Sequence, residues 1–372
     1  MPTSRSRLVF IDFLKAFASQ LIVLHHLAFY GPLSDVAMEL APTLIGWLSE
    51  YARIAVQVFL VVGGFLAARG LAPTGTLVES RPMMLLLRRY LRLAPPFVAA
   101  LGLAMAGAAL ARVWLDHDSI PGAPSATQVL AHVALLHNIL DVDALSAGVW
   151  YIAIDFQLFA LLVLVLWAAR GIVGSGHAGA AISRAMVFSL ALASLFYFNR
   201  NAEWDIWGLY FVGAYGMGAL AFWASDRSRS PWRLGLVAVA AIAALVVDFR
   251  LRIAVALVTA LVLGIARRTG WMERCPEFRP VTFLSRISYS LFLVHFPVCL
   301  VVNAAFTRYA PETPAVSALG MGVAWLGSLV AGTLFHTYVE SRVWRRPPVP
   351  VPATAPAAPK GAAATGTLAP QS

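Results

Sequence analysis

The stretch from Arg7 to Pro32 constrains this chain more than any other part of its sequence. It reads RLVFIDFLKAFASQLIVLHHLAFYGP and is apolar over the length of about 20 residues that a helix needs to cross a bilayer. Ionisable groups at membrane depth are costly and generally face a protein interior or a watery cavity. The stretch therefore predicts a membrane span with a functional site, and the alternative is a hydrogen-bonded polar seam between helices. The ionisable side chains inside its apolar run are Asp12, Lys15, His25 and His26.

The spacing of these side chains places three of them on one face of the predicted helix. Lys15 and His26 are eleven residues apart, so at about 100° per residue their directions agree to within ~20°, with ~16 Å between them along the axis. Asp12 lies within about 40° of the His26 direction. His25 points about 80° away from Lys15 and is the weaker candidate. Because adjacent histidines point about 100° apart on a helix, they cannot easily chelate one metal, and no metal site is predicted.

The rest of the chain has the composition of a polytopic membrane protein. Of 372 residues, 60% are hydrophobic and 12% are charged, against about a quarter charged in soluble domains. The net charge of +10 comes from arginines at the ends of apolar segments. Such arginines set topology, so the charge does not predict a nucleic-acid partner. The two cysteines, Cys275 and Cys299, suggest neither a disulfide nor a metal site.

Ten apolar segments predict an all-α bundle of about ten membrane spans. An even number of spans puts both termini on one side, and the arginine-rich loops place that side in the cytoplasm. The connection DFRLR is the exception, because its two arginines count against this rule. We expect a multi-pass protein of the inner (cell) membrane, in contact with lipids, with one domain over residues 1–346 and a disordered Pro/Ala-rich cytoplasmic tail over 347–372. The segments are 7–32, 51–71, 93–114, 150–169, 186–198, 206–224, 234–247, 253–266, 283–303 and 317–339.

Local features refine two of these segments and one loop. Gly63 and Gly64 would let a neighbouring helix approach the second span closely. The third span is expected to start near residue 93, with Pro95 and Pro96 in its first turn. The outer loop 115–148 contains an apolar piece, 129–140, which is too short to span and is interpreted as interfacial or re-entrant.

Further polar residues in or beside the spans are candidates for chemistry. Arg89 and Arg92 share a helical face and can grip a phosphate together, unless they only set topology. Asp155 lies about one turn inside the outer boundary, where it either orients a catalytic histidine or pairs with an outer-loop arginine. Tyr289 and His295 interrupt a strongly apolar span, and a lone histidine there is more often structural than catalytic. Glu340 and Arg342 are interpreted as a helix cap and charge anchor.

These motifs, in this order, resemble the acyltransferase-3 family of integral membrane acyltransferases. Lys15 to His26 is similar to the family's opening motif, which is an arginine or lysine, ten intervening residues and a histidine. Arg89 and Arg92 match its R-x-x-R stretch before a proline. VWYIAIDFQLF resembles W-x-L-x-x-E-x-Q-F-Y, with Asp155 in place of the glutamate and with the glutamine retained as Gln157.

Two more motifs extend the resemblance over residues 7–342. VFLVVGGFL is similar to the family's F-F-V-x-S-G-F, with Gly63 where a serine is usual. RISYSLFLVHFP resembles I-S-Y-x-x-Y-L-x-H-x-P, with Phe292 where a tyrosine is common. The sequence contains no P-loop, no G-x-S-x-G and no H-E-x-x-H motif.

The resemblance implies an enzyme that transfers an acyl group, commonly acetyl, from acetyl-coenzyme A on the cytoplasmic side. The acceptor is expected to be a hydroxyl of an extracytoplasmic or envelope carbohydrate or a lipid-linked glycan. His26 would take the proton from that hydroxyl or carry the acyl group itself, and Asp155 would assist. Cations at the inner end of a span suit the polyanionic coenzyme, and the candidates are Lys15, Arg89 and Arg92.

A transporter or flippase is the competing hypothesis. It would use Asp12, Lys15 and His26 as a proton or substrate site in a bundle cavity. The sequence shows no paired broken helices and no repeated halves, which are common in such proteins. Dependence on a thioester donor separates the two hypotheses, because a transporter needs none.

Overall fold

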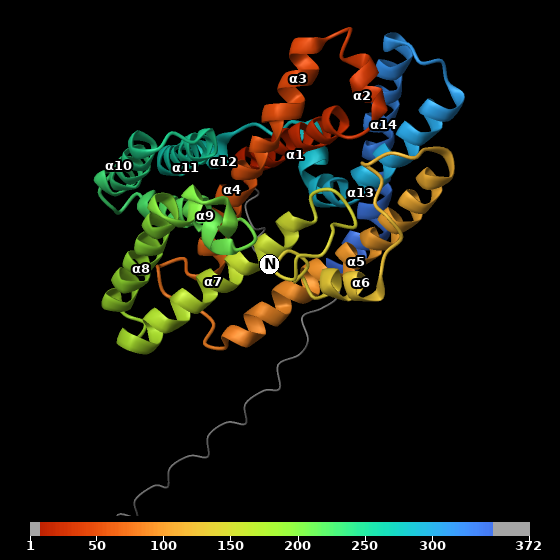
Figure 1. Ribbon diagram of the computed structural model, residues 1–372. Helices are drawn as coiled ribbons and strands as arrows, with labels where there is room; N and C mark the ends of the chain where they lie inside the picture. Colours follow the sequence, from red (N-terminus) through yellow and green to blue (C-terminus); the bar gives the residue numbers. More distant parts are fainter. Residues whose placement is uncertain (1–7, 345–372) are drawn as a thin grey trace, which may run out of the picture.

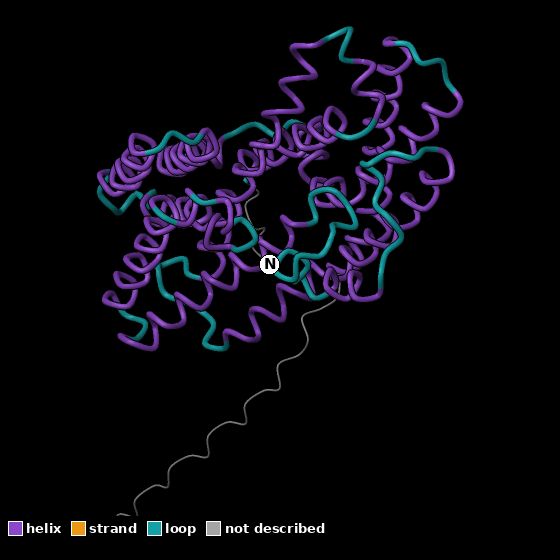
Figure 2. The backbone as a smooth tube through the Cα atoms, viewed as in Figure 1, coloured by secondary structure: helices purple, strands orange, loops and turns teal. Residues whose placement is uncertain are grey.

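The computed structural model describes residues 8–344, which fold as a helical bundle (Figures 1 and 2). The basic head before Leu8 and the expected tail 347–372 lie outside the described residues. The long helices are α1 (Val9–Phe29), α3 (Pro42–Tyr51), α4 (Val56–Leu71), α5 (Pro82–Trp114), α7 (Trp150–Val173), α8 (His177–Phe196), α9 (Gly208–Ala224), α10 (Trp232–Val247), α11 (Leu251–Thr269), α13 (Arg279–Tyr309) and α14 (Pro314–Phe335). Short helices include α2 (Pro32–Ala37), α6 (Ala126–Val133), α12 (Trp271–Arg274) and α15 (Ser341–Trp344).

The helices form two groups around a shared centre. In Figure 1, α8 to α11 gather on the left and α2, α5, α13 and α14 on the right, with α1, α4 and α7 between them. Helix α1 contacts α3, α4 and α13, so the polar first span lies inside the bundle. This position explains how a helix with so many ionisable groups can exist at membrane depth.

Each of the ten expected spans coincides with a helix, which confirms the all-α prediction. Within residues 8–344, seven helical segments are long and apolar enough to cross a membrane. Two of the other expected spans, α9 and α10, are shorter apolar helices. The number of crossings and the cytoplasmic position of the termini therefore stay predictions. The apolar piece 129–140 comprises the end of α6 and the turns after it, and its interfacial or re-entrant position also stays a prediction.

The start of the third span was predicted wrongly. Helix α5 begins at Pro82, so Pro95 and Pro96 lie in its interior and not in its first turn. An interior proline removes a backbone hydrogen bond, and membrane helices tolerate this where neighbouring groups compensate. On α13, the Tyr289 hydroxyl donates to the Leu93 carbonyl oxygen at 3.1 Å, beside this proline pair.

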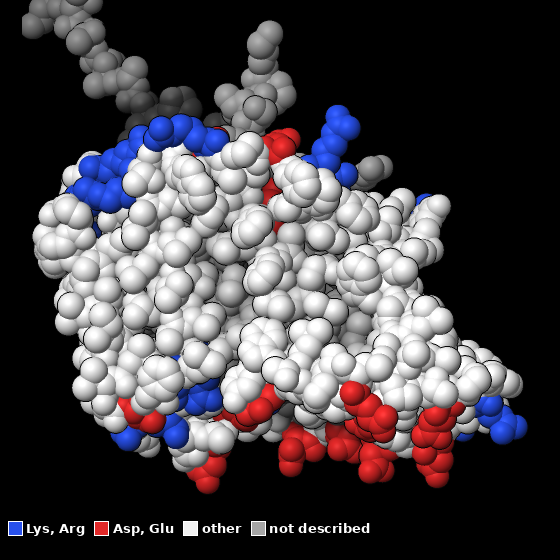
Figure 3. Space-filling model, turned by 90° about the horizontal axis from the view of Figure 1, so that it is seen from above, with Lys and Arg blue, Asp and Glu red and all other residues white. Residues whose placement is uncertain are grey.

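Basic side chains gather along one edge of the molecule and acidic side chains mostly along the opposite edge. Figure 3 shows lysines and arginines along one edge, mostly acidic side chains along the other, and an almost uncharged band between them. Large apolar side chains are exposed along the helices, among them Val113, Val246 and Leu319, as expected of a surface that contacts lipid. The basic edge is the one that the positive-inside rule assigns to the cytoplasm.

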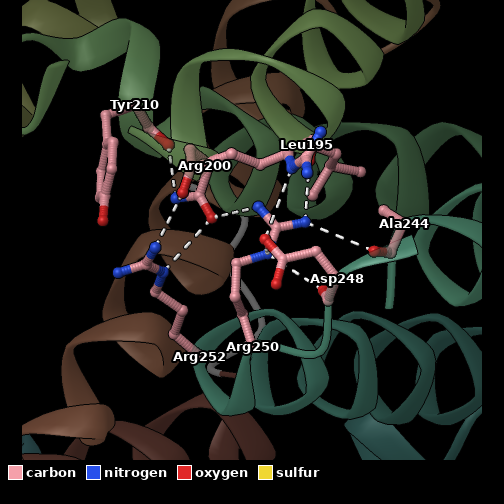
Figure 4. Close-up of polar contacts among 8 residues, drawn as sticks. Leu195, Arg200, Tyr210, Ala244, Asp248, Arg250 and Arg252 are labelled. Carbon is pink, nitrogen blue, oxygen red and sulfur yellow. Dashed lines mark hydrogen bonds and ion pairs between the residues drawn. The ribbon is translucent and has the colours of Figure 1, made fainter. Parts of the chain in front are cut away.

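The two arginines of the DFRLR connection, Arg250 and Arg252, form hydrogen bonds with the ends of neighbouring helices (Figure 4). Arg250 donates to the Leu195 carbonyl oxygen, in the last turn of α8, and to Asn199 Oδ1, each at 2.9 Å. Arg252 donates to the Asn199 carbonyl oxygen at 2.7 Å, and Asn199 Nδ2 donates to the Tyr210 carbonyl of α9 at 2.9 Å. Cations near helix C-termini are stabilising. These two arginines thus join helix ends, which explains how they occur on the side opposite to most other arginines.

The topology is open to a direct test with reporter fusions. We expect fusions in the loop 225–231, which separates α9 from α10, to report a cytoplasmic position. Fusions at 201–203, between α8 and α9, are expected to report the opposite side. Alkaline phosphatase and fluorescent-protein fusions at both positions measure this. An outward position of the 225–231 loop would overturn the predicted orientation.

Two glycines allow α4 and α9 to cross in close contact. A Cβ atom on Gly64 would lie 1.8 Å from the Tyr215 carbonyl oxygen, and one on Gly218 would lie 2.0 Å from the Val61 carbonyl oxygen. Either atom would overlap with the backbone of the facing helix, so only glycine fits. The expected close approach is therefore confirmed at Gly64, whereas a Cβ atom on Gly63 would lie 3.2 Å from the Tyr215 ring.

Helices α1 and α13 run in the same direction and hold the candidate site between them. Near the start of both helices, Ser285 Oγ donates to Asp12 Oδ1 at 2.6 Å. Near the end of α1, His26 contacts His295 of α13. Asp12 and His26 both face α13, as their angular separation on the helix predicts.

Candidate active site

His26 and His295 form a hydrogen-bonded pair inside the bundle. His26 Nδ1 lies 2.5 Å from His295 Nε2, and the two ring planes differ by 3°. His295 Nδ1 lies 3.0 Å from the Leu291 carbonyl oxygen, one turn earlier on α13. His26 is 7% exposed and His295 is fully buried. His295, which the sequence suggested to be structural, therefore forms a hydrogen bond with His26, the histidine expected to react.

This chain of contacts assigns the hydrogens of both neutral rings. The Leu291 carbonyl only accepts, so His295 Nδ1 carries a hydrogen and His295 Nε2 is an acceptor. His26 Nδ1 must then be the donor in the pair, which leaves the lone pair on His26 Nε2. An imidazole with one nitrogen held by a partner and the other available has the arrangement of a general base or nucleophile.

His26 lines a cavity of about 570 Å³ at the end of α1. This volume lies within the usual range for small-molecule sites. Gly148, before α7, forms the wall beside His26 with φ of +77°, and a Cβ atom there would lie 3.1 Å from the Phe292 ring and 3.6 Å from His26 Cε1. Glycine thus permits both the backbone conformation and the open space next to the imidazole. The polar lining includes Arg53, His137, Asn138, Asp141 and Asp205, and the aromatic lining includes Phe29, Tyr30, Trp150, Tyr151, Phe211 and Phe292.

His25 also lines the cavity, but its contacts differ. Its Nδ1 lies 3.0 Å from the Leu48 carbonyl oxygen of α3 and donates to it. This bond joins α3 to α1. His25 Nε2 is thereby also left with its lone pair, so these hydrogen bonds alone do not separate the two histidines. That His26, and not His25, is the reacting histidine stays a prediction from its position in line with Lys15 on α1.

Asp155 of α7 forms an ion pair with Arg89 of α5. The carboxylate is 10% exposed and the guanidinium 26% exposed. The Arg89 guanidinium also lies 5.1 Å from the centroid of the Phe159 ring. The pairing with an outer-loop arginine that was considered from the sequence is therefore wrong, and a role of Asp155 in orienting a catalytic histidine stays a prediction. Only the packing of α5 against α7 brings Arg89 to this carboxylate.

The remaining candidates lie at helix contacts or toward the inner end of α1. Gln157 Oε1 accepts from the Gly208 backbone N–H at 2.7 Å and thereby holds the start of α9. Lys15 is half-buried on α1. Arg92 is exposed, whereas Arg89 is turned toward Asp155. A joint phosphate grip by Arg89 and Arg92 stays a prediction.

The structure reveals a buried polar cluster that the sequence interpretation missed. Glu340 was interpreted as a cap, but it is fully buried. Its carboxylate accepts from Ser290 Oγ of α13, and His336 Nδ1 lies 3.1 Å from it within the π-helical turn η4 (His336–Glu340). The sequence signal was the spacing of four between a histidine and a carboxylate at the end of an apolar run.

Comparison with known proteins supports a family assignment. The sequence model of the acyltransferase-3 family, described as an acyltransferase domain, matches residues 8–333. No curated protein and no solved structure gives a significant match. The matched range contains His26, Arg89, Asp155 and His295, and ends before Glu340.

Proposed function

This chain belongs to the acyltransferase-3 family, and on that premise we propose that it is a membrane O-acyltransferase acting on a carbohydrate hydroxyl. The donor is acetyl-coenzyme A or another acyl-coenzyme A, which approaches from the cytoplasm. The acceptor is an envelope glycan on the other side. The observation that carries this proposal is the His26–His295 pair, which leaves the His26 Nε2 lone pair beside the cavity.

In the proposed reaction, the acceptor hydroxyl donates its hydrogen to His26 Nε2. The hydroxyl oxygen attacks the thioester carbonyl, and its proton passes to the imidazole. His295 Nε2 accepts from His26 Nδ1 throughout and supports the positive charge that forms on the His26 ring. Collapse of the tetrahedral intermediate breaks the carbon–sulfur bond. The proton goes to the departing thiolate, so the products are an ester and free coenzyme A.

A covalent route uses the same nitrogen. His26 Nε2 would attack the thioester carbonyl first, and the carbon–sulfur bond would break to release coenzyme A as a thiolate. In a second step the hydroxyl oxygen would take the acyl group from His26, and the hydroxyl proton would go to the thiolate. The two routes differ in kinetics, since a covalent carrier gives ping-pong patterns with both substrates varied. In both routes the imidazole reacts in its neutral form.

The walls of the cavity suit a carbohydrate acceptor. Aromatic side chains such as Trp150 and Phe292 offer flat apolar surfaces, and Asn138 and Asp141 offer hydrogen-bonding groups for hydroxyls. The cavity lies at the end of α1 that the predicted topology places outside the cytoplasm. An envelope glycan would reach it without crossing the membrane.

Acyl transfer is tested with purified protein, radiolabelled acetyl-coenzyme A and alkali-treated envelope glycan from a strain that lacks the gene. Alkali removes existing esters and exposes the hydroxyls. We expect label to appear on the glycan and to be released again by mild alkali. If label stays in acetyl-coenzyme A or appears only as free acetate, the proposed transferase activity is wrong.

Lys15 is predicted to bind the coenzyme at the inner end of the site. It lies ~16 Å from His26 along the same helix, a separation that an extended donor can bridge. A phosphate accepts either cation, so Lys15→Arg should keep most of the affinity for a non-hydrolysable acetyl-coenzyme A analogue. Lys15→Ala should lose roughly tenfold or more, since a charge-assisted contact contributes about 1.5–3 kcal/mol.

Equilibrium binding of the analogue to detergent-purified variants measures this prediction. Arg308→Ala, in the last turn of α13 and at the predicted outer end, is the matched charge-removal control. Equal affinity of Lys15→Ala and wild type would exclude a donor-binding role for Lys15. Arg92→Ala extends the test to the second expected cation, whereas Arg89 cannot be removed without also breaking its ion pair.

A further inference from the structure

The loop between α5 and α7 contains a pair of stacked histidines that no sequence motif indicated. The rings of His132 and His137 have centroids 4.2 Å apart and planes within 5° of parallel. His132 Nδ1 donates to the Gln128 carbonyl oxygen at 2.8 Å, and its Nε2 accepts from the Leu145 N–H at 3.2 Å. Both nitrogens of His132 are thus used to hold the loop together.

His137 differs from His132 in having no such bonds. It is 1% exposed, and neither its Nδ1 nor its Nε2 has a hydrogen-bond partner among the described residues. It belongs to the lining of the cavity that contains His26. Buried polar groups are nearly always hydrogen-bonded, so a buried imidazole with two unpartnered nitrogens at a cavity is suited to bind a polar ligand from that cavity.

The backbone around His137 is held in an unfavourable conformation. Leu135 has φ of +59° and Asp141 has φ of +50°, a region that residues other than glycine rarely adopt. Such conformations persist where the surrounding structure enforces them, commonly at ligand sites. The segment between these two residues places His137 and Asn138 in the lining of the cavity. Asp141 is itself part of the polar lining.

The charge state of His137 narrows the class of ligand. Burial, and secondly the nearby His132, lower the pKa of His137 to about 4. At neutral pH the ring is therefore uncharged, with one donor and one acceptor nitrogen. A hydroxyl also donates and accepts, and so it matches this ring better than a phosphate or a carboxylate, which only accept.

We propose that His137 binds the acceptor through a hydroxyl that does not react, and thereby presents a second hydroxyl to His26 Nε2. This inference rests on the proposed transferase function and adds the acceptor-binding residue and the class of acceptor. The acceptor carries at least two hydroxyls, as a sugar does, and a simple alcohol is a poor substrate. His137 also determines which hydroxyl receives the acyl group.

Kinetics of three variants test this proposal, with acetyl-coenzyme A and alkali-treated envelope glycan as the substrates. His137→Phe keeps the ring stacked on His132 but removes both polar nitrogens. We expect it to raise the KM for the glycan roughly tenfold or more, the effect of about one hydrogen bond, and to leave the KM for acetyl-coenzyme A unchanged. His137→Gln keeps a donor and an acceptor and should recover part of the glycan affinity. His117→Phe is the control, because it lies in the same loop but outside the cavity lining.

The outcomes separate this inference from the proposed function. If wild-type protein transfers label and His137→Phe shows an unchanged KM for the glycan, the inference is wrong and the transferase function stands. An equal rise in both KM values, or the same effect in His117→Phe, also overturns it, because a distorted loop would explain either result. If wild-type protein transfers no label, the proposed function itself fails.

A measurement on the wild-type protein avoids the risk that a variant does not fold. Diethyl pyrocarbonate modifies neutral imidazoles, and mass spectrometry of the peptides locates the modification. Because His137 is 1% exposed, we expect it to react slowly, with reagent that enters through the cavity. Alkali-treated glycan should slow this reaction further, and acetyl-coenzyme A alone should leave its rate unchanged. Equal modification of His137 with and without the glycan would contradict its role in acceptor binding.

Discussion

Replacement of His26 by alanine is expected to abolish acyl transfer while the protein still accumulates in the membrane. The substitution removes the nitrogen whose lone pair the contact with His295 leaves beside the cavity. General base catalysis typically contributes about 10²–10⁴-fold to a rate. We expect a loss of that size in the initial rate of ester formation from labelled acetyl-coenzyme A, with the KM values for both substrates much less affected.

His25→Ala is the matched control for this prediction. It removes an adjacent imidazole of the same helix that also lines the cavity, and whose Nδ1 is held by the Leu48 carbonyl oxygen of α3 and not by His295. Appreciable activity should remain in it. A third variant, His295→Leu, leaves the His26 Nδ1–H without its acceptor and should slow the reaction without abolishing it. If His25→Ala were inactive and His26→Ala active, the assignment of the reacting histidine would be wrong.

The second large effect is expected at the ion pair between Asp155 and Arg89. Asp155→Asn leaves the Arg89 cation without its counter-ion in a mostly buried position. Removal of one partner from a buried pair typically costs about 3–5 kcal/mol. We expect a clear fall in thermal stability in detergent and a strong loss of activity. Asp155→Glu should retain part of both, since it keeps the negative charge and the resembled family usually has glutamate there.

A double variant separates the catalytic and structural roles of this pair. Asp155→Asn with Arg89→Gln removes both charges, so stability should largely return. If Asp155 also helps to position or polarise the reacting groups, activity should stay low in the stable double variant. Recovery of both properties would reduce the pair to a structural link between α5 and α7. Full activity in the single Asp155→Asn variant would likewise exclude a catalytic contribution.

Local sequence patterns predicted the helices and the faces of α1 well. Apolar length depends only on consecutive residues, and each expected span is a helix. Helical periodicity also depends only on spacing, and it placed Asp12 and His26 on one face, where both contact α13. The start of α5 was predicted too late because prolines inside a membrane helix look like a helix start when neighbouring helices are unknown.

The partners of the site residues were not predictable in the same way. Asp155 and Arg89 are 66 residues apart, and His26 and His295 are 269 apart. The Asp155 carboxylate and the His26 imidazole each had several chemically acceptable partners in the sequence. The choice among them depends on which helices pack together, and that packing is the sum of many contacts along each helix.

The sequence by itself determined the membrane helices, the family and the residue types of the site, because bilayer thickness and helix geometry act on neighbouring residues. Only the tertiary structure decided that His295 orients His26, that Arg89 neutralises Asp155, and that His137 reaches the same cavity from a loop. The physical reason is that hydrogen bonds and ion pairs act over a few ångströms. Their partners are therefore set by distances in space, which folding creates between residues that are far apart in the chain.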